Sequence, residues 1–252
     1  MGVILGERIE GVGSGVCSVT RGEIATAANS PLALDLGKTI SSLLFRMMDV
    51  SWRHPFTLLV SGPSSSGKTV FVENLLKNRF DLIHPLPHRL FWSYGIHQPA
   101  LESRWRGVVD FVPGLSSIEN IPRNSLVVID DQMSETNEVI SNLFTKGSHH
   151  NNLSVIYIIQ NLFGKNPHLR TISLNAHYLV LFKNPRDASQ AINLGKQMYP
   201  KRSAFFQEAY KDATSRPHGY LLCDLRQETS EQLRLRTGIF PEDRDHIVYL
   251  EK

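Results

Sequence analysis

The first residues that could do chemistry form one continuous loop: Gly62, Pro63, Ser64, Ser65, Ser66, Gly67, Lys68 and Thr69. They fit the pattern G-x-x-x-x-G-K-[ST] at every fixed position. The glycines let the backbone curl so that successive N–H groups converge on phosphate oxygens. Lys68 can reach the β- and γ-phosphates of a nucleoside triphosphate, and the Thr69 hydroxyl can bind Mg²⁺. The loop therefore predicts a site for ATP with Mg²⁺ as cofactors.

Two adjacent acids, Asp130 and Asp131, end the apolar run Leu126–Ile129. A phosphate loop needs an acid at the tip of a neighbouring strand, and Asp130 would hold Mg²⁺ there through water. Asp131 would polarise the attacking water as a general base. The alternative interpretation is that the two acids simply end a strand. Because Mg²⁺ binding does not require two adjacent carboxylates, the pair favours hydrolysis by an activated water.

A polar residue, Gln160, ends the next apolar run, residues 153–160. The carboxyl ends of parallel strands face the ligand crevice. If this strand lies beside the strand that leads into the phosphate loop, the Gln160 amide would sense the γ-phosphate or orient the attacking water. An ordinary strand-end cap is the alternative.

These residues need a scaffold of alternating strands and helices, and the hydrophobic pattern predicts one from residue 56 onward. The apolar runs predict strands at 56–60, 89–94, 126–130, 153–160, 177–182 and 219–225. Helical spacing predicts helices at 36–50, 69–78, 134–147, 186–198 and 202–214. Continuous β-branched strands alternating with helices are typical of a parallel sheet covered on both faces. We expect an α/β fold with a central, mostly parallel sheet flanked by helices.

The composition sets bounds on class and partners. The chain has 252 residues, a formal net charge of +3, 41% hydrophobic residues and two cysteines. Two cysteines far apart in the chain favour a reducing, intracellular setting, and no apolar run is long enough for a membrane-spanning helix. We expect a peripheral arm at 1–30, one ATPase domain at 31–225, and a charged tail at 226–252.

Taken together, GPSSSGKT, LVVIDD and KGSHHNNLSVIYIIQNLF resemble the FtsK/HerA superfamily of P-loop ATPases. The nearest likeness is to the genome-packaging ATPases of double-stranded DNA viruses, of the poxvirus type and of Maverick/Polinton-like elements. The resemblance covers roughly residues 55–225. It implies a RecA-like P-loop domain that assembles into a ring, a pentamer or hexamer, and drives double-stranded DNA into a capsid. A capsid or portal protein, in the nucleus or cytoplasm of a host cell, would then be a further partner.

The resemblance also implies roles for single residues. Lys68 and Thr69 match the phosphate and magnesium ligands, Asp130 and Asp131 match the acidic strand tip, and Gln160 matches the polar sensor. The second acid is Asp where many relatives have Glu, which shortens its reach. Ring ATPases also need an arginine from a neighbouring subunit to neutralise charge in the transition state. Arg170 is the first candidate for this finger.

Several alternatives stay open. Arg186 is the second candidate for the arginine finger. A DNA translocase or helicase without a capsid would carry the same motifs, and a small-molecule kinase would share the phosphate loop. The paired acids and Gln160 favour water over an alcohol as phosphoryl acceptor. A GTPase switch is disfavoured because the sequence has no N-K-x-D motif. For His149 and His150, a loop contact to phosphate or DNA is favoured over a metal site, because no cysteine or carboxylate joins them at ligand spacing. An ordinary solvated loop is favoured over both.

Overall fold

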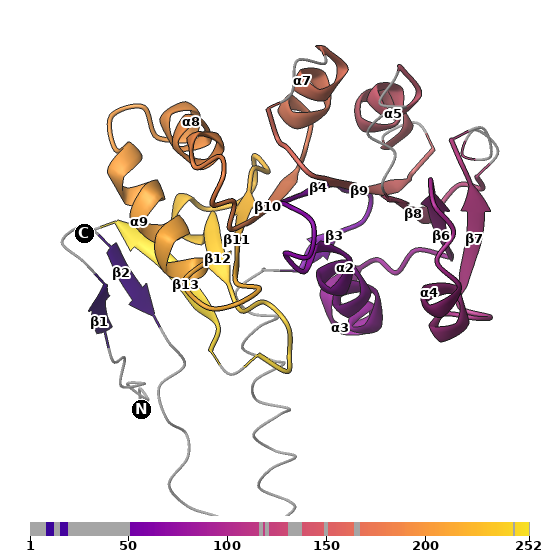
Figure 1. The fold of residues 1–252 in the computed structure, drawn as a ribbon, viewed down its shortest axis with the longest axis horizontal. Helices are drawn as coiled ribbons and strands as arrows, with labels where there is room; N and C mark the ends of the chain where they lie inside the picture. Colours follow the sequence, from indigo (N-terminus) through magenta and orange to yellow (C-terminus); the bar gives the residue numbers. More distant parts are fainter. Residues whose placement is uncertain are drawn as a thin grey trace, which may run out of the picture.

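The scaffold is one large mixed sheet with helices on both faces (Figure 1). The computed structural model describes residues 9–12, 16–19, 51–115, 118, 121–130, 138–148, 151–163, 167–243 and 245–251. Within them the main sheet has 11 strands, in the order β1-β2-β13-β12-β11-β10-β4-β9-β8-β6-β7. The α/β class expected from the sequence is confirmed.

One half of the sheet is parallel and carries every predicted phosphate-binding element. In spatial order its strands are β10 (Tyr178–Phe182), β4 (Thr57–Ser61), β9 (Ser154–Ile159), β8 (Ser125–Asp130), β6 (Arg89–Tyr94) and β7 (Val109–Pro113). Five of these strands match expected ones. The carboxyl ends of all six meet at one edge of the sheet, which is where such folds bind ligands.

The other half is antiparallel, which the sequence pattern did not predict. Its strands are β11 (Tyr220–Asp224), β12 (Leu235–Thr237), β13 (Ile247–Glu251), β2 (Val16–Val19) and β1 (Ile9–Val12). The chain between β10 and β11 forms two helices, whereas a strand–helix–strand unit has one. The second helix reverses the chain again, so β11 runs antiparallel to β10. A separate two-stranded sheet pairs β3 (Trp52–Arg53) with β5 (Ile83–His84).

The helices divide between the two faces of the sheet. In Figure 1, one face carries α2 (Lys68–Lys77), α3 (Arg79–Leu82) and α4 (Pro99–Arg104). The other carries α5 (Glu138–Asn142), the π-helical turn η3 (Leu143–Gly147), α7 (Pro167–Leu174), α8 (Ser189–Met198) and α9 (Ser203–Ala213). A 3₁₀ turn, η4 (Glu231–Leu233), precedes β12.

The four central parallel strands, β4, β8, β9 and β10, are buried on both faces, which explains their largely apolar sequences. In β9, Val155 and Tyr157 pack into the core under α5 and α7, whereas Ile156 and Ile158 pack into the core that includes α2. Side chains of successive strand residues point to opposite faces. A strand buried on both sides therefore needs an apolar residue at every position.

The predicted domain boundaries do not coincide with the edge of the sheet. The segment 226–252, expected as a charged tail, contributes β12 and β13, and the segment 1–30, expected as an arm, contributes β1 and β2. The expected helix at 36–50 lies outside the described residues, as do Asp131, His149 and His150. In the described part of the chain, none of the helices has the length and hydropathy needed to cross a membrane.

Candidate functional site

The predicted phosphate loop connects the end of β4 to the start of α2. Its backbone is anchored at the sheet edge, because the Gly62 N–H donates to the carbonyl of Ile159 at the end of β9, at 3.3 Å. Gly67 has φ = 108°, a left-handed conformation that favours glycine. Ser65 is also left-handed, with φ = 62°. The loop is thus a tight strand–turn–helix connection, as the motif requires.

Gly62 is needed for a different reason, which is space. A Cβ at this position would lie 2.7 Å from Phe182 Cβ and 2.8 Å from Ser66 Oγ. Both contacts are shorter than real Cβ atoms tolerate, so a side chain at position 62 would push the loop away from β10. The first glycine of the motif therefore keeps the loop closely packed on the neighbouring strand.

The start of α2 is open to an anion. The helix has no side-chain cap and no acidic residue in its first turn. The first N–H groups of a helix have no partner within the helix, and its N-terminus carries partial positive charge. Lys68 Nζ lies across the loop, where it donates to the carbonyls of Gly62 at 2.7 Å and of Pro63 at 2.8 Å.

The residues present fit a magnesium–nucleotide complex. Ser66 Oγ is buried within the loop and has no hydrogen-bond partner among the described residues, and the loop presents one ammonium group and several backbone donors. The Thr69 hydroxyl and the Asp130 carboxylate are hard oxygen ligands of the kind that Mg²⁺ takes. ATP would thus be held by residues 62–69, and Mg²⁺ by Thr69 and Asp130.

The order of the strands brings Gln160 and Asp130 to the edge of the sheet that carries the loop. β9 lies between β4 and β8, and all three run parallel. Gln160 follows β9 directly and is exposed, whereas Asp130 ends β8 and is only 5% exposed. The prediction for Gln160 required its strand to lie beside the strand that leads into the phosphate loop. The pairing of β9 with β4 meets this requirement. Asp131, the predicted general base, lies outside the described residues.

The two candidate arginine fingers lie on different elements. Arg170 is exposed on α7, the helix that follows β9. Arg186 is exposed on the loop between β10 and α8, and its backbone N–H donates to Asn184 Oδ1 at 3.2 Å. Both arginines stay predictions for the finger.

A residue that sequence reasoning missed, His218, contacts the phosphate loop from outside. Its Nδ1 lies 3.1 Å from the carbonyl oxygen of Ser66. Its ring also fills the space beside Gly67, since a Cβ on that glycine would lie 3.3 Å from His218 Cβ and Nδ1. His218 precedes β11 and is 152 residues away from Ser66 in the chain, so no local pattern could have identified it.

An aromatic cluster packs α2 against strands β10 and β11 of the sheet. The ring of Phe71, one turn into α2, meets Tyr220 edge-on at a centroid distance of 4.8 Å and Phe240 at 5.2 Å. Phe182 lies 6.2 Å from Phe71. Burial raises the pKa of the Tyr220 hydroxyl, with the Asp243 carboxylate adding to the effect. The Tyr220 hydroxyl therefore stays neutral, and it accepts the N–H of Ile239 at 3.0 Å.

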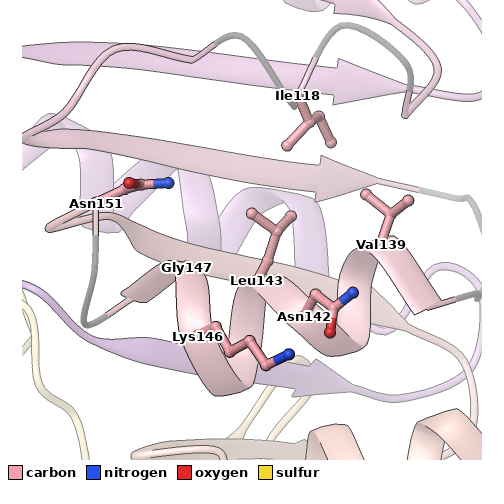
Figure 2. Close-up of a pocket in the computed structure, with 7 residues that line it drawn as sticks. All are labelled: Ile118, Val139, Asn142, Leu143, Lys146, Gly147 and Asn151. Atoms are coloured by element: carbon pink, nitrogen blue, oxygen red, sulfur yellow. The ribbon is translucent and has the colours of Figure 1, made fainter.

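A cavity of about 260 Å³ lies away from the phosphate loop (Figure 2). It is lined by residues of α5 and η3, together with Ile118 and Asn151. Val139 and Leu143 point from the helical segment toward Ile118, and Lys146 also lines the cavity. No residue of the phosphate loop lines this cavity. In the described ranges, no group of three or more His, Cys, Asp or Glu side chains could hold a metal ion.

Comparison with known proteins finds likeness only among solved structures. The chain matches no family model and no curated protein. It is similar to the genome packaging NTPase B204 from Sulfolobus turreted icosahedral virus 2. In complex with AMPPCP, that structure has 15% identity and a TM-score of 0.44, and the match covers 69% of this chain and 95% of that chain. In complex with sulfate, it has 13% identity and the same TM-score, over 69% and 94% of the two chains.

A second similar structure is EssC (ATPases 2 and 3) from Geobacillus thermodenitrificans, with 10% identity and a TM-score of 0.44. The match covers 78% of this chain but only 39% of that chain.

Proposed function

We propose that this chain is a Mg²⁺-dependent ATPase that moves double-stranded DNA, as a ring-forming motor that packages DNA into a viral capsid. The observation that carries the ATPase part is the arrangement of three parallel strand ends. The phosphate loop follows β4, Gln160 follows β9, and Asp130 ends β8, in that spatial order. The DNA and capsid parts rest on the resemblance of the three motifs to packaging ATPases.

The roles of the residues follow from their chemistry. The loop N–H groups and Lys68 would bind the triphosphate, and Thr69 and Asp130 would hold the metal ion. When bound, Mg²⁺ neutralises charge on the phosphate oxygens. Asp131 would accept the proton of the attacking water, and Gln160 would orient that water. Arg170 of an adjacent subunit would add positive charge to the site.

The role of Asp131 can be tested by Asp131→Asn, which keeps size but removes the base. We expect turnover to fall by about 10²–10⁴-fold, the range for loss of a general base, while nucleotide binding persists. Steady-state phosphate release and binding of a fluorescent ATP analogue measure the two quantities separately. A folded Asp131→Asn protein with near-normal turnover would remove Asp131 as the base.

DNA movement can be tested without a capsid. A third strand bound to a DNA duplex is released when a motor passes through it, and release can be followed by fluorescence. We expect ATP-dependent release by the assembled protein and none by Lys68→Ala. ATP hydrolysis without strand release at any DNA length would leave an ATPase that does not translocate, and a screen of small hydroxyl acceptors would then test the kinase alternative.

A further inference from the structure

A buried amide, Gln190, joins the segment after β9 to the loop after β10. Gln190 lies in the first turn of α8 and is 7% exposed. Its Oε1 accepts the backbone N–H of Leu162 at 2.8 Å. Its Nε2 donates to Asn161 Oδ1 at 3.2 Å and to Asp187 Oδ2 at 2.7 Å. Both ends of the amide are therefore engaged.

The residues that Gln190 holds come directly after Gln160. Asn161 and Leu162 continue the chain from the end of β9, and Leu162 is 2% exposed. On its other side, the end of β9 is tied to the phosphate loop, through the Gly62 N–H and the Ile159 carbonyl at 3.3 Å. Gln160 thus lies between two anchored residues. Ile159 before it is hydrogen-bonded to the phosphate loop, and Leu162 after it is hydrogen-bonded to the Gln190 side chain.

The partner of Gln190 in the next loop is itself fixed. Asp187 also accepts a hydrogen bond from the Ser189 hydroxyl. The start of the same loop is held by Tyr210 of α9, whose hydroxyl donates to the Phe182 carbonyl at 3.0 Å and accepts the Asn184 N–H at 3.2 Å. Asp187, the partner of the Gln190 amide, is therefore part of a loop that is hydrogen-bonded to α9.

These residues pack close to the phosphate loop. Ser61, Gly62, Asp187, Gln190 and Tyr210 all line one small cavity, of about 10 Å³. That volume holds about one water molecule, so the polar residues around Gln190 and the start of the phosphate loop are separated by hardly any free space. A shift of the Gln190 amide would be transmitted to the strand end that carries Gln160.

We propose that Gln190 is a positioning residue, which holds the segment Asn161–Leu162 and so fixes the place of Gln160 beside the phosphate loop. An amide is required, because the position must accept an N–H and donate to a carboxylate at the same time. This inference rests on the proposed ATPase function, and it adds a residue that acts through Gln160 rather than on the nucleotide.

The first test is Gln190→Met, which keeps the length of the side chain and removes its hydrogen bonds. We expect kcat for ATP hydrolysis to fall by about 10–100-fold, since misplacement of a positioned group by about 1 Å has effects of that size. The dissociation constant for an ATP analogue should change less than about 3-fold, because the loop residues are untouched. Gln197→Met, the same change at an exposed position of α8, should leave both quantities unchanged.

A double-mutant cycle asks whether Gln190 acts through Gln160. In a Gln160→Ala background, Gln190→Met should lower kcat by less than about 2-fold, because the group that it positions is gone. A merely structural role predicts the same fold-change in both backgrounds, together with weaker nucleotide binding. Either of those two results would overturn the proposal.

A swap of the two polar partners tests the same claim if Gln190→Met fails to fold. Gln190→Glu places a carboxylate against Asp187 and should lower kcat, whereas Gln190→Glu combined with Asp187→Asn restores one donor and one acceptor and should recover it. No recovery in the folded double variant, or normal turnover in Gln190→Glu, would overturn the role proposed for Gln190 but not the proposed ATPase function. No hydrolysis by the unaltered protein overturns the proposed function, and the inference falls with it.

Discussion

At the scale of single residues, Lys68 is the residue that we propose contacts the transferred phosphate. Its ammonium group already lies over the loop, 2.7 Å from the Gly62 carbonyl. We expect Lys68→Ala to lower kcat for ATP hydrolysis by about 10²–10³-fold, the range for loss of one preorganised group that stabilises developing charge. Steady-state phosphate release measures the effect.

Lys77→Ala is the matched control for this prediction, because Lys77 ends the same helix and its side chain is 66% exposed. Its ion pair with Glu242 spans 3.2 Å at the surface, and such pairs contribute little to stability. Turnover should therefore stay normal in Lys77→Ala. Equal activity of both variants would show that hydrolysis does not depend on this loop.

The sequence predicted the phosphate loop because its spacing is local, eight consecutive residues with fixed glycines. It could not predict Gln190 or His218, which reach the site through the fold. Gln190 is 28 residues from Leu162, and His218 is 152 residues from Ser66. Gln and His also occur at many other positions, so their types alone do not mark them as neighbours of a phosphate site.

At the scale of elements, a half-buried carboxylate, Glu73, fixes α2 to α4. Glu73 receives two hydrogen bonds from Arg104, both at 3.0 Å, and one from Trp105 Nε1 at 2.9 Å. The Glu73 side chain is only 16% exposed. We expect Glu73→Ala to lower the free energy of unfolding by about 1.5–3 kcal/mol, the usual range for hydrogen bonds to a charged group.

Urea denaturation checks this value, and Glu231→Ala is the control. Glu231 also pairs with an arginine, Arg234, at 2.7 Å, but its side chain is 74% exposed. The control should change the free energy of unfolding by less than about 1 kcal/mol. A Glu73→Ala protein as stable as the Glu231→Ala protein would contradict the role given to the contact between α2 and α4.

A second element contact should make stability depend on pH. His54, 6% exposed, lies before β4, and its Nδ1 is 2.6 Å from Ser154 Oγ at the start of β9. Burial, with a smaller effect of His88, lowers the pKa of His54 below its ordinary 6.5. The unfolded chain then takes up this proton before the folded one does, so stability is lost as the pH falls through about 6.5 toward the lowered pKa.

Unfolding measured at several pH values between about 7.5 and 5.5 tests this sign. The free energy of unfolding should fall with pH in the unaltered protein and fall less steeply in His54→Gln. Parallel curves for the two proteins would show that His54 does not contribute to the pH dependence.

Secondary structure was predicted best where both faces of a strand are buried, as in β6, found at residues 89–94 as expected. Of the helix expected at 134–147, the described part, from Glu138 onward, ends in a π-helical turn, Leu143–Gly147. Apolar spacing does not distinguish an α-helix from a short π-helical turn. The direction of β11 was also missed, because it depends on how two successive helices return the chain to the sheet.

At the scale of the whole molecule, the proposed ring predicts that one subunit completes the site of the next. Arg170→Ala and Lys68→Ala should each lower turnover strongly, because Arg170→Ala impairs the neighbouring subunit's site and Lys68→Ala impairs its own. When the two variants are mixed, some interfaces pair an intact Lys68 with an intact Arg170, and turnover should return. Recovery on mixing, measured as phosphate release, would support Arg170 as the finger.

Unchanged turnover of Arg170→Ala in an assembled ring would eliminate that residue. The same mixing experiment with Arg186→Ala then tests the second candidate, which lies on the loop after β10. The shared partner in both mixtures is Lys68→Ala, so the two arginines are compared against the same inactive site.

The central claim, that ATP hydrolysis at this loop serves the movement of DNA, is tested most directly by steady-state ATP hydrolysis with and without long double-stranded DNA. Lys68→Ala is the blank. If this claim holds, turnover will depend on Lys68 and rise when DNA is added. Turnover that is absent in the unaltered protein, or that is equal in Lys68→Ala and indifferent to DNA, would contradict it.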